Sequence, residues 1–390
     1  MEMKNTPKLR FPGFTYPWEQ RKLGEIVSAY SGGTPSASNK EYYGGDIPFI
    51  RSAEINNNHT ELYITQKGLK DSSAKLVEKG TILYAMYGAT SGEVSISQID
   101  GAINQAILAM VPLMYDGEFI AQYLRRQKKN IINKYLQGGQ GNLSANIVLN
   151  LQIQLPGVDE ANQITSFFVK LDNLITLHQR KLEHLKLKKK SLLQKLFPKE
   201  GEVYPELRFP GFTGPWEQCK LADVANIIMG QSPSSQNYTD NPNDDILVQG
   251  NADLIDGQVV PRLWTKEITK SIDEGNIIMT VRAPVGDVAK TAYKVVLGRG
   301  VAGIKGDEYI YQFLLKLKYN HYWRSLSSGS TFESINSNDI KNLIIDIPCD
   351  EERTKIGNLL RTTDSLINLY QRKLEHLKLL KKALLQQLFV

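Results

Sequence analysis

The sequence predicts a mixed α/β (α+β) protein with two globular blocks and two long antiparallel helices, built as a pseudo-twofold internal repeat. Three observations predict this fold class. The phrase KLRFPGFTYPWEQRKL at 8–23 returns as ELRFPGFTGPWEQCKL at 206–221. The segments 177–197 and 369–389 are identical at 17 of 21 positions. The blocks between these repeated ends have diverged heavily, which indicates one shared frame presenting two different surfaces.

The aromatic phrase that opens each half is predicted to join a block to a helix. Because the second helix stops where a third copy of the phrase would follow, we expect the two chain termini to lie close together at the first block. The aromatic residues expected to pack at the two junctions are Phe11, Phe14, Trp18, Phe209, Phe212 and Trp216.

Each block is predicted to combine strands and helices. NLQIQLP and NLIIDIP alternate apolar and polar residues, as half-buried strands do. GTILYAMY and GNIIMTV are short apolar runs that follow a glycine, which is also typical of strands. Apolar residues recur with helical spacing in one segment of each block. These segments are 150–156, 342–348, 80–87 and 275–281 for the strands, and 118–136 and 308–326 for the helices.

Two long helices follow the blocks, and each carries apolar residues at spacings that alternate between four and three. This is the heptad pattern of a coiled coil. Lys189, Lys381, His178 and Thr363 are its polar positions. The predicted apolar seam is Ile164, Phe168, Leu171, Ile175, Leu182, Leu185, Leu192 and Leu196, with Ile356, Leu360, Ile367, Tyr370, Leu374, Leu377, Leu384 and Leu388.

The helices can pair within one chain or act as a zipper between two chains. A zipper between two chains would not need a second copy of the helix within each chain, so the sequence favours pairing of the two helices within one chain. If the two halves are equivalent, the second helix returns toward the first block, and the pair runs antiparallel. Each seam covers 33 residues, which is about 50 Å of helix.

The composition permits an anionic partner and excludes some other classes of protein. The chain has 390 residues, 41% of them hydrophobic and 23% charged, with a net charge of +6. No apolar run is long enough to span a membrane, and MEMKNTPKLR does not resemble a secretory signal. The two cysteines, Cys219 and Cys349, form no disulfide framework, so a cytoplasmic location is expected.

No catalytic or metal-binding motif is found. The sequence contains no Gly-Lys, so it has no P-loop. The closest string to a methyltransferase Asn-Pro-Pro motif is NPND at 241–244, which is typical of a turn. The five histidines and two cysteines lack metal-ligand spacing. We therefore predict no catalytic residue, no metal site and no enzymatic activity in this chain.

The order of modules resembles the specificity subunits of type I restriction–modification systems, the HsdS family. The resemblance rests on the paired RFPGFT-PWEQ phrases, the two diverged blocks and the repeated QRKLEHLK helices. YSGGTPSASNKEYYGGDIPFIRS (30–52) also matches the opening of the family's target-recognition domains. In the second block, Gln231 and Ser232 replace Gly33 and Thr34. The implied division of the chain is 1–156 and 205–348 as target-recognition domains, with 157–204 and 349–390 as conserved helices.

The resemblance implies a non-catalytic subunit whose two domains read a bipartite, asymmetric double-stranded DNA site. It implies docking of two modification (methyltransferase) subunits and, through them, of restriction subunits. No cofactor is expected in this chain, whereas S-adenosylmethionine, ATP and Mg are expected on the partner subunits. The alternatives are a coiled-coil scaffold with protein-binding blocks and a self-contained DNA-modifying enzyme, which the missing motifs disfavour.

Loop residues able to contact bases or phosphates are the candidate site. Arg282, at a strand end before a proline turn, is the strongest single prediction. Two basic runs, 125–134 and Lys186 with Lys188–Lys190, can grip phosphates or an acidic partner, or can simply face solvent. The predicted DNA-binding residues are Thr34, Ser36, Asn39, Lys40, Tyr43, Arg51, Tyr87, Thr90, Gln105 and Gln140 in the first block, and Gln231, Ser232, Ser234, Asn237, Gln249, Asn251, Arg262, Arg282 and Arg299 in the second.

Overall fold

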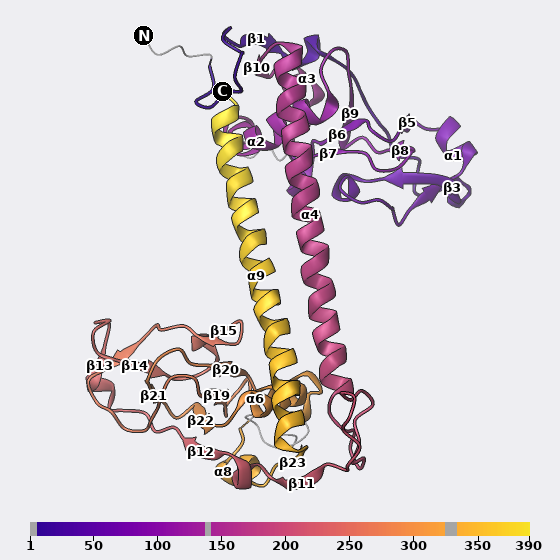
Figure 1. The fold of residues 1–390 in the computed structure, drawn as a ribbon. Helices are drawn as coiled ribbons and strands as arrows, with labels where there is room; N and C mark the ends of the chain where they lie inside the picture. Colours follow the sequence, from indigo (N-terminus) through magenta and orange to yellow (C-terminus); the bar gives the residue numbers. More distant parts are fainter. Residues whose placement is uncertain (1–5, 137–141, 324–333) are drawn as a thin grey trace. The chain divides into compact units, whose positions relative to one another are not determined.

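Two long helices, α4 (Val158–Lys195) and α9 (Asp350–Leu388), are shared between the two units of the computed structural model (Figure 1). The structure describes residues 6–136, 142–323 and 334–390. One unit combines Met1–Leu177 with Leu374–Val390, and the other is His178–Lys373. Each unit therefore contains one globular block, part of α4 and part of α9, as the internal repeat predicts.

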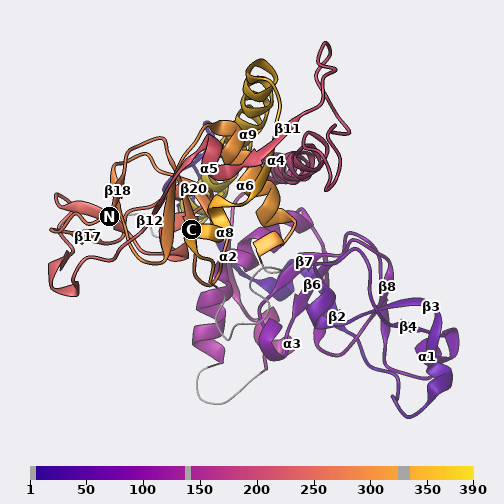
Figure 2. The ribbon, with the colours of Figure 1, turned by 90° about the horizontal axis from the view of Figure 1, so that it is seen from below.

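The first block is built on two four-stranded sheets. One is antiparallel with the order β2-β9-β6-β7, and the other has the order β4-β3-β8-β5 with β3 and β8 parallel. In Figure 2, strands β3, β4 and β8 gather with α1 at one end of the block, beyond β2, β6 and β7. The elements are β2 (Val27–Ser31), β3 (Tyr43–Ile50), β4 (Tyr63–Ile64), β5 (Lys75–Val77), β6 (Ile82–Ala85), β7 (Val94–Ile96), β8 (Gly101–Ile103), β9 (Ile107–Pro112), α1 (Gln66–Lys70), α2 (Gly117–Tyr135), α3 (Ala145–Leu149) and the short 3-10 turns η1 (Leu23–Glu25), η2 (Lys40–Tyr42), η3 (Ser52–Glu54) and η4 (Gly88–Thr90).

The second block repeats this plan with extra short strands. Its sheets have the orders β12-β22-β19-β20-β16-β15 and β13-β17-β14-β21-β18, and β14 pairs in parallel with β21 as β3 does with β8. The elements are β12 (Asn226–Met229), β13 (Tyr238–Thr239), β14 (Asp245–Val248), β15 (Leu254–Ile255), β16 (Gln258–Val259), β17 (Trp264–Thr265), β18 (Ser271–Ile272), β19 (Ile277–Thr280), β20 (Val288–Lys290), β21 (Val295–Leu297), β22 (Val301–Lys305), α5 (Leu221–Val224), α6 (Glu308–Tyr319), α8 (Ser337–Lys341), η5 (Ser235–Asn237) and η6 (Asn251–Asp253).

The predicted strands are confirmed, and the same local signals form them in both blocks. All four residues of β6 and all four of β19 are buried. Gly80 and Gly275 precede these strands at φ of 97° and 79°, a conformation that favours glycine at the turn. The alternating segments become β10 (Gln152–Leu155) and β23 (Ile344–Ile347), which pair with β1 (Glu19–Lys22) and β11 (Glu217–Lys220).

The block helices are also confirmed, although one is shorter than predicted. Asp116 caps α2 by accepting a hydrogen bond from the Glu118 amide, and Asp307 caps α6 by accepting one from the Ile310 amide. The predicted helix 308–326 ends at Tyr319. Asn320 is its C-cap, and His321 takes a left-handed φ of 55°, which breaks the helical path. Residues 324–326 lie outside the described part of the chain.

An aromatic core joins each block to the helices of its unit. In the first unit, Phe389 lies 6.1 Å from Trp18, 5.4 Å from Phe119 and 6.0 Å from Phe168, measured between ring centroids. In the second unit, Phe197 takes the same place and lies 6.5 Å from Trp216. The predicted packing of the two tryptophans is therefore confirmed. Phe11 contacts Phe167 edge-on, Lys355 lies over Phe212, and Phe14 and Phe209 are half-buried.

The aromatic phrase is also tied to the helices by matched polar contacts. Arg10 makes a two-bond ion pair with the buried Glu160 of α4, at 2.7 and 2.8 Å. Arg208 repeats this pair with Glu352 of α9. The Leu9 amide donates to the Gln387 carbonyl at 2.9 Å. The N-terminal phrase thus lies against the end of α9, as the sequence predicts.

Each side chain of the predicted coiled-coil seam is buried or half-buried. Leu196 lies one residue beyond the end of α4, but its amide still donates to Leu192 at 2.9 Å. Asp172 pairs with Lys381 in the first unit, and Lys189 pairs with Asp364 in the second. In each unit, an early residue of one helix therefore meets a late residue of the other, so the paired segments run antiparallel.

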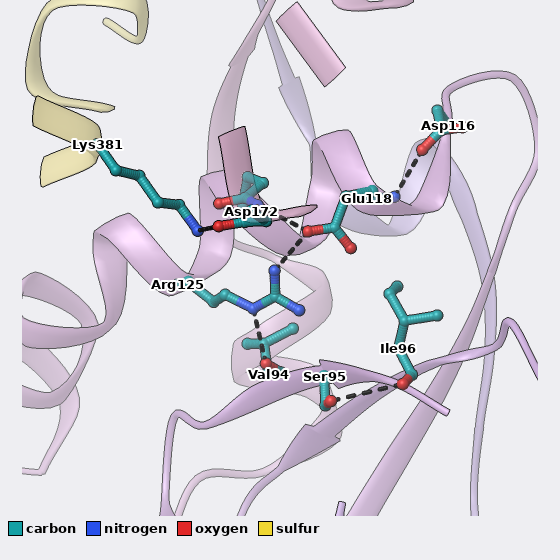
Figure 3. A network of polar contacts seen from close by, with 9 residues as sticks. Val94, Ser95, Ile96, Asp116, Glu118, Arg125, Asp172 and Lys381 are labelled. Carbon is teal, nitrogen blue, oxygen red and sulfur yellow. Dashed lines mark hydrogen bonds and ion pairs between the residues drawn. The ribbon is translucent and has the colours of Figure 1, made fainter. Parts of the chain in front are cut away.

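A polar network connects each seam pair to the helix of its block. In the first unit, Gln122 of α2 donates to both Asp172 and Glu118. Figure 3 shows that Glu118 also accepts from Arg125, which in turn donates to the Val94 carbonyl of β7. In the second unit, Gln312 of α6 donates to Asp364 and Glu308 in the same way, at 2.8 Å each. The two networks dock equivalent block helices onto equivalent seam positions.

Candidate nucleic-acid interface

Four tight loops of the second block meet around one open pocket. The pocket has a volume of about 390 Å³. Five of the nine residues predicted for this block line it, so residues from distant parts of the sequence come together there. The complete lining is Ser232, Gln249, Gly250, Asn251, Arg282, Ala283, Arg299 and Gly300.

Glycines allow these loops to approach one another. A Cβ atom at Gly230 would lie 2.0 Å from the Gly298 carbonyl oxygen, and one at Gly300 would lie 2.1 Å from that of Gln249. Such distances are closer than any real side chain tolerates, so the loops pack backbone against backbone. The sequence prediction missed these glycines. The signal was present in GRG at 298–300, where glycines flank a predicted arginine.

Hydrogen bonds orient three of the lining side chains, those of Ser232, Gln249 and Asn251. The Arg299 amide donates to the Ser232 hydroxyl at 3.0 Å, and the Gln249 side chain donates to the Tyr238 hydroxyl at 2.8 Å. The Asn251 amide nitrogen donates to Asp287, which also forms an ion pair with Lys318 of α6. Asp287, Lys318 and Tyr238 were not predicted, because strand geometry and not sequence spacing brings them to the pocket.

The remaining predicted residues of the second block lie outside the pocket lining. Ser234 and Asn237 donate to Glu267, at 2.9 and 2.7 Å. These bonds hold the pKa of the Glu267 carboxyl below its usual value, and the bond from the Ser234 amide has the larger effect. Arg262 donates to the Ala252 carbonyl at 3.0 Å and lies 3.9 Å from Asp253. Gln231 is exposed next to Ser232.

The first block has an equivalent arrangement of loops with different side chains. A Cβ atom at Gly32 would lie 1.9 Å from the Ile103 carbonyl oxygen, so the same close approach recurs. The Thr34 hydroxyl donates to Gln105, a pair that corresponds to Ser232 and Arg299. Ser36 bonds Ser38 at 2.8 Å, and the Tyr43 hydroxyl donates to the Pro35 carbonyl at 2.6 Å.

Other predicted residues of the first block have local roles or lie at its surface. Asn39 caps η2 by accepting from the Glu41 amide at 3.1 Å, and Lys40 in that turn is exposed. Tyr87 forms an isolated bridge with Asn142, and the Thr90 hydroxyl donates to the Tyr87 carbonyl. Gln140 lies outside the described residues.

Arg51 is engaged by two carboxylates. Its guanidinium lies 2.9 Å from Glu54 and 2.8 Å from Glu61. The hydrogen bond from Arg51 lowers the pKa of Glu54 to about 2, and the carboxylates raise the pKa of Arg51. By contrast, Arg282 and Arg299 have exposed side chains without an acidic partner among the described residues. Among the predicted arginines, Arg282 and Arg299 are therefore the two at the second-block pocket that remain free to bind a ligand.

The predicted basic runs are only partly engaged in contacts inside their units. In the run 125–134, Arg126 donates to the Val390 carbonyl at 2.8 Å, and Lys128 pairs with Glu93. Burial lowers the pKa of Arg126. In the second run, Lys189 is buried in the seam against Asp364, whereas Lys186, Lys188 and Lys190 are exposed.

The described residues place limits on other kinds of site. In 6–136, 142–323 and 334–390, no three His, Cys, Asp or Glu side chains gather as metal ligands. Within the same ranges, none of the helices is both long and apolar enough to traverse a bilayer. Cys219 and Cys349 are free thiols.

Comparison with known proteins identifies the family of both halves. Residues 16–187 and 213–379 match the family described as "Type I restriction modification DNA specificity domain". The putative type I restriction enzyme MjaX specificity subunit of Methanocaldococcus jannaschii is 27% identical, over 95% of this chain and 92% of its own length. The HindI specificity subunit of Haemophilus influenzae is 32% identical over 33% of this chain and 29% of its own.

Solved structures share the fold. The type I restriction–modification S subunit from M. genitalium superposes with a TM-score of 0.67 at 16% identity, covering 99% of both chains. A chain from a study of type I restriction–modification complex assembly and conformational transition superposes with a TM-score of 0.57 at 23% identity, covering 98% of this chain and 99% of that one.

Proposed function

Because the chain belongs to the family of type I restriction–modification DNA specificity subunits, we propose that its two blocks read the two halves of one split, asymmetric DNA site. Its role is recognition of the DNA target rather than catalysis, and it acts in a complex with DNA and other subunits. The observation that carries the proposal is the pair of equivalent loop clusters, one in each block, that present different side chains on the same backbone plan.

The chemistry of these loops suits base recognition. Arginine, glutamine, asparagine and serine side chains are those that hydrogen-bond base edges in the major groove. They project from loops whose glycines allow close backbone packing, so the loop backbones are positioned before DNA binds. Because the blocks differ while their frames agree, the two half-sites differ in sequence, and the complete site is not a palindrome.

We further propose that the repeated helices dock two modification subunits, through which restriction subunits join. The two helices have near-identical sequences at 177–197 and 369–389, which supports two equivalent docking positions. In this proposal, S-adenosylmethionine, ATP and Mg bind the partner subunits, because no motif for them occurs here. Isothermal titration of the isolated chain with S-adenosylmethionine is expected to show no binding, and saturable binding would contradict this assignment.

Methylation mapping tests the main proposal. Genomic DNA from cells expressing the modification subunit with or without this chain is sequenced for methylated adenine and cytosine. A bipartite motif that appears only with the chain is the expected result. If methylation does not depend on the chain, and if the assembled complex shows no salt-dependent DNA binding, the blocks bind proteins and the proposal fails.

A further inference from the structure

The second-block pocket, defined above by its eight lining residues, contains two arginines, Arg282 and Arg299. Arg282 follows β19, and Arg299 lies between β21 and β22. Both side chains are exposed and have no acidic partner among the described residues. The backbone of each is fixed, by a bridge from Arg282 to Ser334 and by the bond from the Arg299 amide to Ser232. The pocket thus presents two guanidinium groups on loops whose backbones are fixed by hydrogen bonds.

Asn251 supplies an acceptor beside them. One N–H of its side-chain amide donates to Asp287, which leaves the carbonyl oxygen and the second N–H for a ligand. Asp287 is held in turn, because its own amide donates to the Thr280 hydroxyl at 2.9 Å and its carboxylate pairs with Lys318. A carboxylate only accepts, and it therefore forces the NH₂ group of Asn251 toward itself.

We propose that the second-block pocket reads a G·C base pair, and that Asp287 is the positioning residue that makes Asn251 an acceptor for it. The inference rests on the proposed function and names the base pair that one block reads. In the major groove, guanine offers two acceptors, O6 and N7, and cytosine offers the N4 amino donor. Arginine is the commonest partner of guanine, and an acceptor is needed for cytosine.

An A·T pair fits this set of groups less well. Adenine places an amino donor beside its N7 acceptor, and thymine adds a methyl group. A guanidinium would then face a second donor and lose one of its two bonds. The first block lacks these groups at equivalent positions, since Gln105 stands in place of Arg299 and Tyr87 in place of Arg282. The G·C preference therefore belongs to the second half-site.

The experiment uses the chain assembled with its modification subunits. The methylated motif is mapped first, and duplexes are then made with each pair of the second half-site changed from G·C to A·T. Affinities of the wild type and of Arg282→Gln, Arg299→Gln and Asp287→Asn are measured on every duplex. Lys294→Gln is the matched control, because it removes one exposed positive charge of the same block outside the pocket.

The wild type is expected to prefer G·C at one position or more, and each pocket variant to lose roughly five-fold or more of that preference. Asp287→Asn should change the base preference more than the affinity, a split that a merely structural residue would not show. Lys294→Gln and the first half-site should keep wild-type preferences. Thermal unfolding of each variant identifies any that misfolds, and the two exposed arginines carry the test if Asp287→Asn does so.

Two results overturn the inference while leaving the proposed function intact. One is a bipartite motif whose second half contains no G·C pair. The other is that the arginine variants bind all duplexes more weakly to the same degree, which would show that they hold phosphates. If no motif depends on the chain at all, the proposed function itself fails.

Discussion

Gly300 shows how a residue without a side chain controls what its neighbours present. Its position allows the loop that carries Arg299 to lie against the backbone of Gln249. The polar side chains of the pocket can vary between blocks, but the close approach of loops recurs in both, at Gly32 and at Gly230. At this scale, recognition depends first on backbone packing and then on the side chains that the packed loops hold.

We predict that Gly300→Ala abolishes reading of the second half-site. The new Cβ atom would lie 2.1 Å from the Gln249 carbonyl oxygen, so one loop must move, at about 1–3 kcal/mol of folding free energy. Methylation by the assembled complex is expected to lose its dependence on the second half-site. Gly214→Ala is the control, because a Cβ atom there meets nothing within 4 Å. Intact discrimination in Gly300→Ala would contradict the packing argument.

The loop that contains Glu54 should depend on pH in a defined direction. Glu54 accepts the amides of Arg51 and Glu61 and the Arg51 guanidinium, and its pKa falls from 4.5 to about 2. Its stabilising contribution is therefore complete above about pH 4.5 and is lost as the pH falls toward 2. Glu54→Gln should cost about 1–3 kcal/mol of local opening free energy at pH 7, and little near pH 2.

Hydrogen exchange of peptides covering residues 49–61 measures this effect. At pH 7, these amides should exchange faster in Glu54→Gln than in the wild type, and the difference should shrink as the pH is lowered. Glu25→Gln, an exposed residue of η1, is the control for loss of one carboxylate. Equal exchange of the Glu54 variant and the wild type at pH 7 would show that the carboxylate does not hold the loop.

At the scale of elements, the seam pair of Lys189 and Asp364 matters because Lys189 is buried. Lys189 is 6% exposed, and its ammonium has Asp364 as its partner. We predict that Asp364→Leu alone destabilises the fold by about 3–5 kcal/mol, because it leaves a buried charge unpaired. Lys189→Met combined with Asp364→Leu should recover most of this loss.

Thermal unfolding of the single and double variants tests the seam prediction. Asp172→Leu and Lys381→Met provide the matched pair in the other unit, where the network is the same but Lys381 is more exposed. The cost of breaking the pair should be smaller there. A double variant that is less stable than Asp364→Leu would contradict the argument, because it would mean that the ion pair is worth more than apolar packing.

The sequence predicted these elements well because their signals are local. The heptad spacing of apolar residues located α4 and α9, and the alternation of apolar and polar residues located β10 and β23. Both patterns arise because each element buries one face. Lys189 and Lys381 were placed in the seam by the same spacing. Their partners, Asp364 and Asp172, were not predicted, because a pairing between helices depends on the antiparallel register and not on spacing within one helix.

The candidate site was only partly predictable for a related reason. Loop composition and the resemblance to HsdS selected five residues that line one pocket. They could not reveal that Arg51 is neutralised by Glu54 and Glu61, or that Asp287 holds Asn251. These contacts join segments that the sheets bring together, and nothing in the sequence near either partner marks them. Whether a side chain is free to contact a DNA base depends on its tertiary contacts, which the local sequence does not reveal.

At the scale of the whole molecule, the repeat separates a constant frame from two variable blocks. The same contacts recur in both units: an arginine on a buried glutamate, a tryptophan against a phenylalanine, and a glutamine bridging block helix to seam. Because the helices and junction contacts of each unit are repeated, the loops of the blocks can change in sequence without disturbing these contacts. In the proposed function, the two half-sites then have independent sequences, and we predict that the frame controls the gap between them.

The last prediction concerns that gap. Because the helix segments run antiparallel in each unit, a seven-residue insertion must enter both helices to preserve the seam. We predict that one heptad added after Leu177 and one added after Lys373 lengthen the gap by about three base pairs, since seven residues add about 10 Å of helix and B-DNA rises 3.4 Å per base pair. Both half-site sequences should remain unchanged. Methylome sequencing measures the motif directly. A single insertion in one helix is the control, because it shifts the seam and should abolish methylation. If the complex with both insertions still methylates the original motif, helix length does not set the gap.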